Sequence, residues 1–248
     1  MKGIMIHCGG KYVSYDELRK VETPRATRSW NPYPYHRLVD SVQSLLGEHD
    51  LRSVHHKYAI SRDGDRFFGL MQIRNGVDSD DYGNVLGLRA SHDKSLSTEL
   101  AAGTGVFVCD NMSFCGSEQV KRKHTTHVER DLKKVVGKAL AACASHWVDQ
   151  AKRIEVYKET KLSRKSVHDI VVKAMLAGAI PNTKVPEVLA EYENPTYEDF
   201  RPRTGWSLHN AFTEVMKKNQ MRLNLVQDRT LRLTGLLDQE LGVHLAKK

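Results

Sequence analysis

Short apolar runs separated by turn residues dominate the first half of the chain, and this pattern predicts β-strands. Apolar residues from Tyr58 to Ile60 and from Phe68 to Ile73 flank the sequence Arg62-Asp63-Gly64-Asp65. An Asp-Gly pair between two such runs is a strong hairpin signal, because glycine accepts the positive φ that a tight turn requires. We therefore predict two antiparallel strands joined at residues 62–65.

Further segments extend this predicted sheet. Val85–Arg89 is typical of a third strand, and Val106–Cys109 is typical of a buried central strand because it is a short apolar run between turn signals. Ser95–Ala102 predicts a short helix, and Ile4–Ile6 predicts a short strand near the start. The first half is thus expected to form a meander of about four strands with short helices inserted.

The second half has helical spacing. From His127, one face stays apolar for roughly thirty residues, which predicts the longest helix of the chain. Its apolar positions are Val128, Leu132, Val135, Ala139, Cys143, Trp147, Ala151 and Ile154. Shorter helices are predicted after Ser14 (capping box with Glu17), at 38–46 (ended by Gly47), after Ser163 (closed by Gly178), at 185–192 (Pro186 in the first turn), after Thr204 and at 231–241.

These elements predict an α+β fold. An antiparallel β-meander in the first half packs on a long central helix, and a helical second half follows. The β-rich part covers residues 1–116 and the helical part 117–248. Because no linker rich in Pro, Gly or Ser and no internal repeat separates the two parts, we expect a single domain over residues 1–248.

An aromatic, proline-rich loop precedes the first of the longer helices. Residues 22–35 hold three of the seven prolines together with Trp30 and Tyr33, so regular helix is excluded there. The rings of Trp30 and Tyr33, beside Arg25 and Arg28, are candidates for stacking on nucleic-acid bases or on a partner protein. The alternative is that they clamp the loop to the core.

Composition and charge describe a folded, basic protein. The 248 residues are 40% apolar and 27% charged, and the formal net charge is +8. A basic excess favours polyanionic partners, since Lys and Arg neutralise phosphates and release counterions, although general surface charge is an equally good explanation. The start of the chain lacks the apolar core of a signal peptide, and no apolar run approaches the roughly 20 residues that span a bilayer. We therefore expect free cysteines, no membrane association and a cytoplasmic location, which is the host cytoplasm if the protein is encoded by a phage.

The densest basic cluster lies between the predicted central strand and the long helix. It comprises Lys121, Arg122, Lys123 and His124, followed along the helix by Arg130, Lys133, Lys134 and Lys138. Helical spacing brings positions 130, 133, 134 and 138 to one face, where a stripe of cations is able to follow a phosphate backbone. A solvated helix face, with its charge diluted by Glu129 and Asp131, is the competing interpretation. These eight residues, with Trp30 and Tyr33, are our candidate nucleic-acid-binding set.

Other motifs favour no catalytic, metal or cofactor site. Cys109, Cys115, His124 and His127 do not have the spacing of a structural zinc site. Ser91-His92-Asp93 consists of adjacent residues, which favours a turn with local hydrogen bonds over a catalytic triad. Gly103-Thr104-Gly105 lacks the third glycine of a dinucleotide-binding motif. We expect no catalytic residue, metal or cofactor, and an enzyme without recognised motifs is the third functional hypothesis.

Three segments in order resemble one family. They are Ser91-His92-Asp93-Lys94-Ser95, then Val106-Phe107-Val108-Cys109-Asp110-Asn111-Met112, then Trp206-Ser207-Leu208-His209-Asn210-Ala211-Phe212-Thr213-Glu214. Together they resemble the phage/plasmid-like proteins also called domain of unknown function 932, over residues 22–218. The family more often has glycine where Lys94 stands. The order of hairpin, strands and long helix is also similar, more distantly, to phage single-strand annealing proteins.

The resemblance implies an origin in mobile genetic elements and no settled activity. The similarity to annealing proteins implies a basic groove lined by a sheet and a long helix, and protomers that assemble into rings or filaments. We therefore expect a phage-type protein that binds nucleic acid, with single-stranded DNA binding or annealing as the first hypothesis. The alternative is an anti-defence protein that docks on a host defence or nuclease complex and inhibits it.

Overall fold

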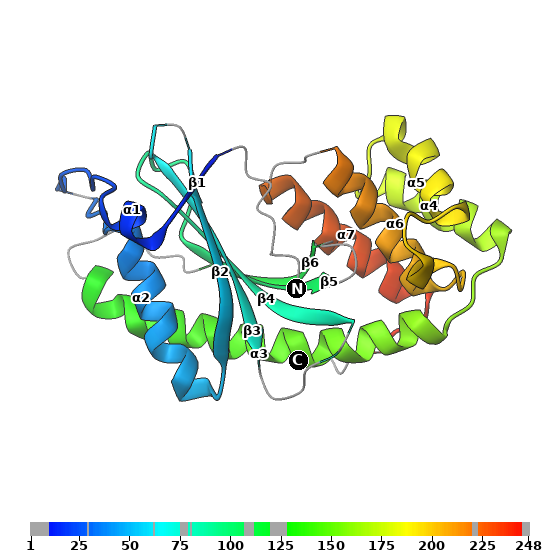
Figure 1. Cartoon of the computed structure of the whole chain (residues 1–248), viewed down its shortest axis with the longest axis horizontal. Coiled ribbons are helices and arrows are strands. Elements are labelled where there is room, and N and C mark those ends of the chain that lie inside the picture. The colour runs from blue at the N-terminus through cyan, green and yellow to red at the C-terminus, as the bar shows by residue number, and fades with distance from the viewer. Residues whose placement is uncertain are drawn as a thin grey trace.

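The described part of the chain forms one curved antiparallel sheet flanked by helices (Figure 1). The structure, a computed structural model, describes residues 10–28, 30–61, 63–74, 79, 81–106, 112–119, 128–219 and 223–244. Six strands follow one another in the order of the sequence, and each pairs antiparallel with the next. They are β1 (Lys11–Val13), β2 (Arg52–Ile60), β3 (Arg66–Arg74), β4 (Tyr82–Ser91), β5 (Glu99–Val106) and β6 (Met112–Gln119). The predicted α+β meander is confirmed. The strand expected at Ile4–Ile6 lies outside the described residues.

Local signals place the predicted hairpin correctly. Gly64 has φ +79°, the conformation that the Asp-Gly turn requires, and Ser61 N–H donates to the Arg66 carbonyl at 2.9 Å to close the loop. The register then places Tyr58 opposite Gly69 and Ile60 opposite Phe67. The turn sequence therefore located this hairpin correctly.

The prediction of a helix at Ser95–Ala102 is wrong, because β5 occupies Glu99–Val106. Alanine and leucine favour helices in isolation, but this segment lies between β4 and β6, and Leu100 and Ala102 are completely buried on the face toward the main core. Burial in the sheet outweighs local preference here. Of the strand expected at Val106–Cys109, Val106 belongs to β5, and residues 107–109 lie outside the described part.

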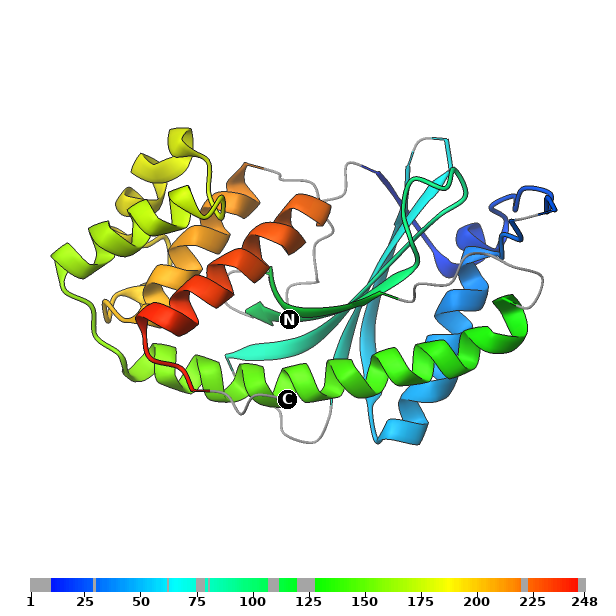
Figure 2. The same cartoon turned by 180° about the vertical axis from the view of Figure 1, so that it is seen from behind.

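One face of the sheet packs against two helices. They are α2 (Tyr35–Leu46) and α3 (Val128–Glu159), and the capped helix α1 (Tyr15–Arg19) lies beside α2. The core between these helices and the sheet includes Phe67, Met71, Leu86, Leu100, Leu38, Val42, Leu132, Val136, Leu140 and Trp147. Figures 1 and 2 show α3 beneath the sheet, running from α2 to the helical half. Trp147 Nε1 donates to the Gly103 carbonyl at 3.1 Å, which ties the middle of α3 to β5.

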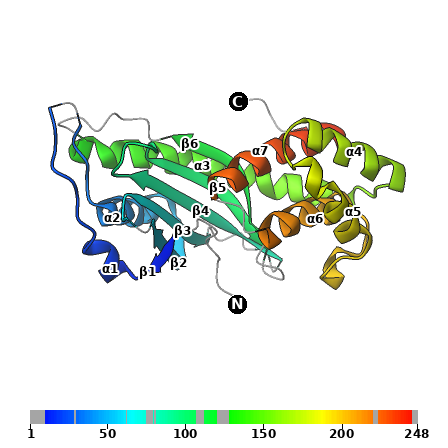
Figure 3. The same ribbon diagram turned by 90° about the horizontal axis from the view of Figure 1, so that it is seen from above.

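The second half of the chain builds a separate hydrophobic core on the C-terminal part of α3. Its helices are α4 (Arg164–Leu176), α5 (Val185–Glu193), α6 (Gly205–Lys218) and α7 (Leu223–Glu240), with short 3₁₀ segments η2 (Asn182–Lys184) and η3 (Glu198–Phe200). This core includes Ile154, Tyr157, Ile170, Leu208, Phe212 and Leu237. Seen from above, α7 reaches the β5–β6 side of the sheet, and α7 contacts β6 (Figure 3).

Helix ends follow the predicted caps, and one cap has an unexpected backbone conformation at the predicted position. Ser14, Ser163 and Thr204 each accept a hydrogen bond from the backbone N–H three residues on, and Ser14 forms the full capping box with Glu17. Gly178 has φ +71° after α4. This cap is Gly47, which follows α2 but continues into the 3₁₀ segment η1 (Gly47–His49) with φ −63°, so the left-handed residue is Asp50 at φ +55°.

Candidate nucleic-acid interface

The basic residues predicted to bind nucleic acid divide into two groups. Lys121, Arg122, Lys123 and His124 lie outside the described residues. Arg130 belongs to α3, and its side chain is outside the described part. Lys133, Lys134 and Lys138 are all exposed on α3, and we call these three residues the lysine ridge.

The lysine ridge is exposed because of the periodicity of α3. Leu132, Val136, Ala139, Leu140 and Cys143 are buried against the sheet and α2. At about 100° per residue, Lys134 and Lys138 lie on the side of the helix opposite Leu140 and Cys143, and Lys133 lies on the flank. The ridge therefore points away from the sheet. The three lysines would therefore meet a phosphate backbone on the outer side of α3. The resemblance to annealing proteins implied a groove between sheet and helix instead.

None of the three ridge ammonium groups has an ion pair or hydrogen bond to a described residue. Elsewhere on α3 and in the helices that follow it, some cations are paired across elements. Arg153 Nε lies 2.7 Å from Asp238 Oδ1, and Lys173 Nζ lies 2.9 Å from Glu240 Oε2. The ridge lysines thus keep their charge available for an external anion.

Tyr33 is unavailable for base stacking, which corrects its assignment to the candidate set. Its side chain is 2% exposed, and its hydroxyl lies 2.5 Å from Thr98 Oγ1. Burial raises the pKa of Tyr33 to about 12, although the hydrogen bond with Thr98 opposes this effect. The Tyr33 carbonyl lies 3.0 Å from Nε2 of His92. This ring therefore clamps the proline-rich loop to the sheet, as the alternative hypothesis stated.

Trp30 is only partly buried, at the surface end of the same loop. Lys94 Nζ lies over its ring at 4.8 Å from the centroid, a distance at which a cation and an aromatic face attract each other. Trp30 remains in the candidate set, with the Lys94 ammonium group over its ring.

Ser91-His92-Asp93 forms a structural turn and has no triad geometry. Ser91 Oγ bonds to the backbone of Leu96, and the His92 ring stacks on Tyr35 with centroids 3.9 Å apart. Burial would raise the pKa of Asp93, but hydrogen bonds from Ser95 and Arg66 outweigh it and lower the pKa to about 2.

Lys94 follows this turn with φ +64°, a left-handed conformation that favours glycine. The tight turn is therefore present in this chain with a lysine at the left-handed position.

The third motif, Trp206 to Glu214, is buried within α6 and forms part of a polar junction. His209 Nε2 lies 3.1 Å from Ser113 Oγ of β6, and its ring stacks on Trp206 at 5.2 Å. Burial, with a further contribution from the charge of Arg153, lowers the pKa of His209 to about 4, so the ring is neutral at pH 7.

Two residues of α3 connect this junction to α7. Arg153 Nε donates to both carboxylate oxygens of Asp238 at 2.7 and 2.9 Å, and the Tyr157 hydroxyl donates to Asp238 Oδ1 at 2.7 Å. Burial and the Asp238 carboxylate raise the pKa of Tyr157. We call Arg153, Tyr157, His209 and Asp238 the polar junction. None of these four residues was predicted to have a role, although His209 belongs to the third motif and Arg153 lies beside the apolar stripe of α3.

The described residues contain no group of three or more His, Cys, Asp and Glu side chains placed to hold a metal ion. Cys109, His124 and His127 of the rejected zinc set lie outside the described residues, as does the side chain of Cys115. Within the same described ranges, no helix has both the length and the apolar composition needed to cross a membrane.

Comparison with known proteins identifies one family. The family model described as Domain of unknown function (DUF932) matches residues 25–240. No curated protein and no solved structure matches the chain. The order of the three motifs quoted above thus led to the correct family.

Proposed function

We propose that this chain, which belongs to the DUF932 family, binds nucleic acid through the lysine ridge and the basic segment that precedes α3 in sequence. The supporting observation is that Lys133, Lys134 and Lys138 are exposed on one helix and have no ion pair or hydrogen bond to a described residue. Single-stranded DNA is the polymer that we expect, and the family description assigns no activity that would favour another.

The physical basis is counterion release. An exposed ammonium group without a carboxylate partner keeps its full charge, so it neutralises a phosphate without first breaking an intramolecular ion pair. Lys134 and Lys138 are separated by about 6 Å along the helix axis, given a rise of about 1.5 Å per residue. A strand lying along α3 would therefore meet successive positive charges.

Fluorescence anisotropy with a labelled oligothymidylate, repeated over a KCl series, tests the proposal. The variant Lys133→Gln, Lys134→Gln, Lys138→Gln removes the ridge. If each lysine neutralises one phosphate, the slope of log affinity against log salt becomes shallower by about 2, since each contact to a single strand contributes about 0.7. RNA and duplex DNA of the same length show which polymer is preferred.

A matched variant separates local from general charge effects. Lys20, Lys161 and Lys165 are also exposed, and their replacement by Gln removes the same total charge from the C-cap of α1, the α3–α4 connection and α4. We expect this control to leave the salt slope unchanged. Equal losses in both variants, or no binding at low salt, would reject the ridge as the interface. In the second case, co-purification of a host protein would favour the inhibitor hypothesis.

A further inference from the structure

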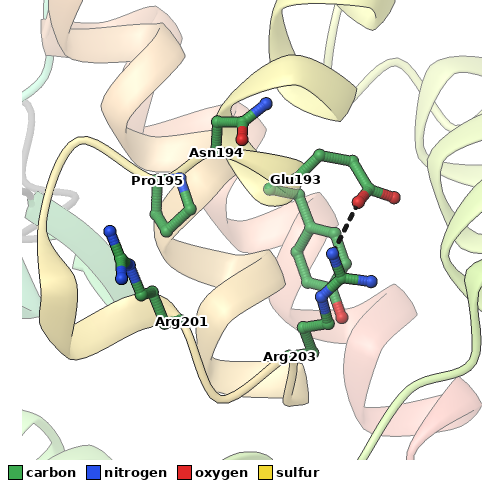
Figure 4. A pocket seen from close by; sticks show the side chains of 6 residues that line it. Glu193, Asn194, Pro195, Arg201 and Arg203 are labelled. Carbon is green, nitrogen blue, oxygen red and sulfur yellow. Dashed lines mark hydrogen bonds and ion pairs between the residues drawn. The ribbon is translucent and has the colours of Figure 1, made fainter.

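A polar cavity of about 300 Å³ lies where α5 ends, far along the chain from the lysine ridge. Its lining consists of Tyr192, Glu193, Asn194, Pro195, Arg201 and Arg203. In Figure 4, Arg201 lies on the side of Pro195 and Arg203 on the side of Glu193. The volume is at the lower end of the range for ligand pockets, so the cavity suits a small ligand or one end of a longer molecule.

Tyr192 supplies a hydroxyl group that lacks a hydrogen-bond partner. Its side chain is 3% exposed, and within the described part of the chain no group lies at hydrogen-bond distance from its oxygen. Buried hydroxyl groups in native proteins are nearly always hydrogen-bonded. Burial also raises the pKa of Tyr192, so the group stays protonated and is a donor.

Arg203, which lines the same cavity, is held in an unfavourable backbone conformation. Its φ is +58°, which costs energy for any residue other than glycine. The Leu162 N–H donates to the Arg203 carbonyl at 3.0 Å, and Arg203 Nη2 donates to Glu193 Oε2 at 2.8 Å. Glu193 Oε1 also lies 3.7 Å from Arg164 Nε. Because Arg203 and Arg164 share this one carboxylate, a net positive charge remains.

Of the two cavity arginines, Arg201 has the ion pair that a ligand would break more easily. It pairs with Glu198 at 2.6 Å, but the two side chains are 68% and 74% exposed, and such surface pairs contribute little. Two guanidinium groups (Arg201 and Arg203) and one carboxylate (Glu193) line the cavity, so the net charge of its lining is +1. An incoming dianion is able to displace Glu198 from Arg201.

We infer that this cavity binds a phosphate monoester. The guanidinium groups of Arg201 and Arg203 contact phosphate oxygens, because a planar guanidinium matches phosphate geometry. The Tyr192 hydroxyl and the Asn194 amide donate the remaining hydrogen bonds. The monoester belongs either to a free nucleotide or to the phosphorylated end of a strand. This inference does not rest on the lysine ridge, which lies on a different helix.

Isothermal titration calorimetry on the full chain tests the inference with four probes: inorganic phosphate, adenosine, adenosine 5′-monophosphate, and a short oligothymidylate with or without a 5′-phosphate. We expect the nucleotide to bind and adenosine not to bind. Tighter binding of the 5′-phosphorylated strand than of the same strand without its 5′-phosphate would identify a strand end as the source. Failure of adenosine 5′-monophosphate to bind, with no gain in affinity from the 5′-phosphate of the oligothymidylate, would overturn the inference.

Three variants assign the binding to the cavity. Arg203→Gly removes the guanidinium group while glycine adopts the positive φ without strain, and Arg201→Gln removes the second one. Tyr192→Phe deletes only the hydroxyl group. Each is expected to weaken binding of the monoester about tenfold or more, as for the loss of a hydrogen bond to a charged group.

Two control variants make the result specific. Arg37→Gln, at an exposed position on α2, should leave the affinity unchanged, and so should the triple variant of the lysine ridge. If Tyr192→Phe and Arg203→Gly bind the monoester as the unmodified chain does, the cavity is not the site. Loss of oligonucleotide binding in the ridge variant with intact monoester binding would show that the two sites are independent.

Discussion

Three lysines in the N-terminal half of α3 and two cations near its C-terminal end differ in whether they are paired. In the N-terminal half, Lys133, Lys134 and Lys138 are exposed and have no partner among the described residues. In the C-terminal half, Arg153 is buried and bonds to Asp238, and Lys158 bonds to Asp81. Paired cations of α3 thus join this helix to distant elements, whereas the lysine ridge points toward solvent.

This difference separates cations that stabilise the fold from cations that are available to bind a partner. A buried cation needs a carboxylate partner, because its desolvation is otherwise uncompensated. An exposed lysine needs none and adds little to stability. Substitutions in the polar junction should therefore lower the free energy of unfolding, and substitutions in the lysine ridge should weaken the binding of nucleic acid.

The largest expected effect on stability follows removal of Asp238. Asp238→Ala leaves Arg153 buried without its carboxylate and removes the acceptor of the Tyr157 hydroxyl. The free energy of unfolding should fall by about 3 kcal/mol or more, as for other broken buried ion pairs. Urea denaturation followed by circular dichroism measures it.

Asp169→Ala is the matched control, because this carboxylate pairs with Lys173 at 2.8 Å while 60% exposed. It should cost less than about 1 kcal/mol. Equal costs for the two variants would remove the distinction between buried and exposed pairs.

The second largest effect is a loss of stability in mild acid caused by His209. Its pKa is lowered from 6.5 to about 4 in the folded chain, so the unfolded chain binds the proton more readily between these values. The contribution of the neutral His209 to the free energy of unfolding is therefore fully present above pH 6.5 and declines as the pH falls toward 4. At about 1.4 kcal/mol per pKa unit, the total loss is roughly 3 kcal/mol.

Urea denaturation at a series of pH values measures this slope. His209→Gln removes the titrating group, so the variant should lose the part of the slope that lies between pH 4 and 6.5. An unchanged slope in the variant would assign the acid sensitivity to other groups.

The smallest expected effect is that of the lysine ridge on stability. The triple Lys→Gln variant at positions 133, 134 and 138 should change the free energy of unfolding by no more than about 0.5 kcal/mol, since exposed substitutions away from packed groups rarely do more. Thermal unfolding measures it. A large destabilisation would mean that these lysines support the fold, and the comparison between the two ends of α3 would fail.

Features that depend on neighbours in the sequence were predictable. The caps at Ser14, Ser163 and Thr204 and the turn at Gly64 use hydrogen bonds or torsions within a few residues, so the sequence shows them directly. The amphipathic stripe of α3 is likewise a local pattern repeated over many turns.

Features that depend on distant partners were missed or misplaced. The segment 95–102 has a local preference for helix, and only its position between two other strands makes Glu99–Val106 a strand. Tyr33 was placed correctly in a loop, but its orientation toward Thr98 follows from a contact 65 residues away. The cavity at Arg203 was not predicted, because a left-handed arginine has no signature in sequence.

The amino-acid sequence by itself determined the α+β order of elements, the long amphipathic helix, the basic character of the protein and, through three ordered motifs, its family. Tertiary structure alone decided which charges are shared within the fold and which remain toward solvent. The reason is physical: propensity and periodicity act over a few residues, whereas pairing and burial of a charge depend on atoms that the folded chain brings together from far apart.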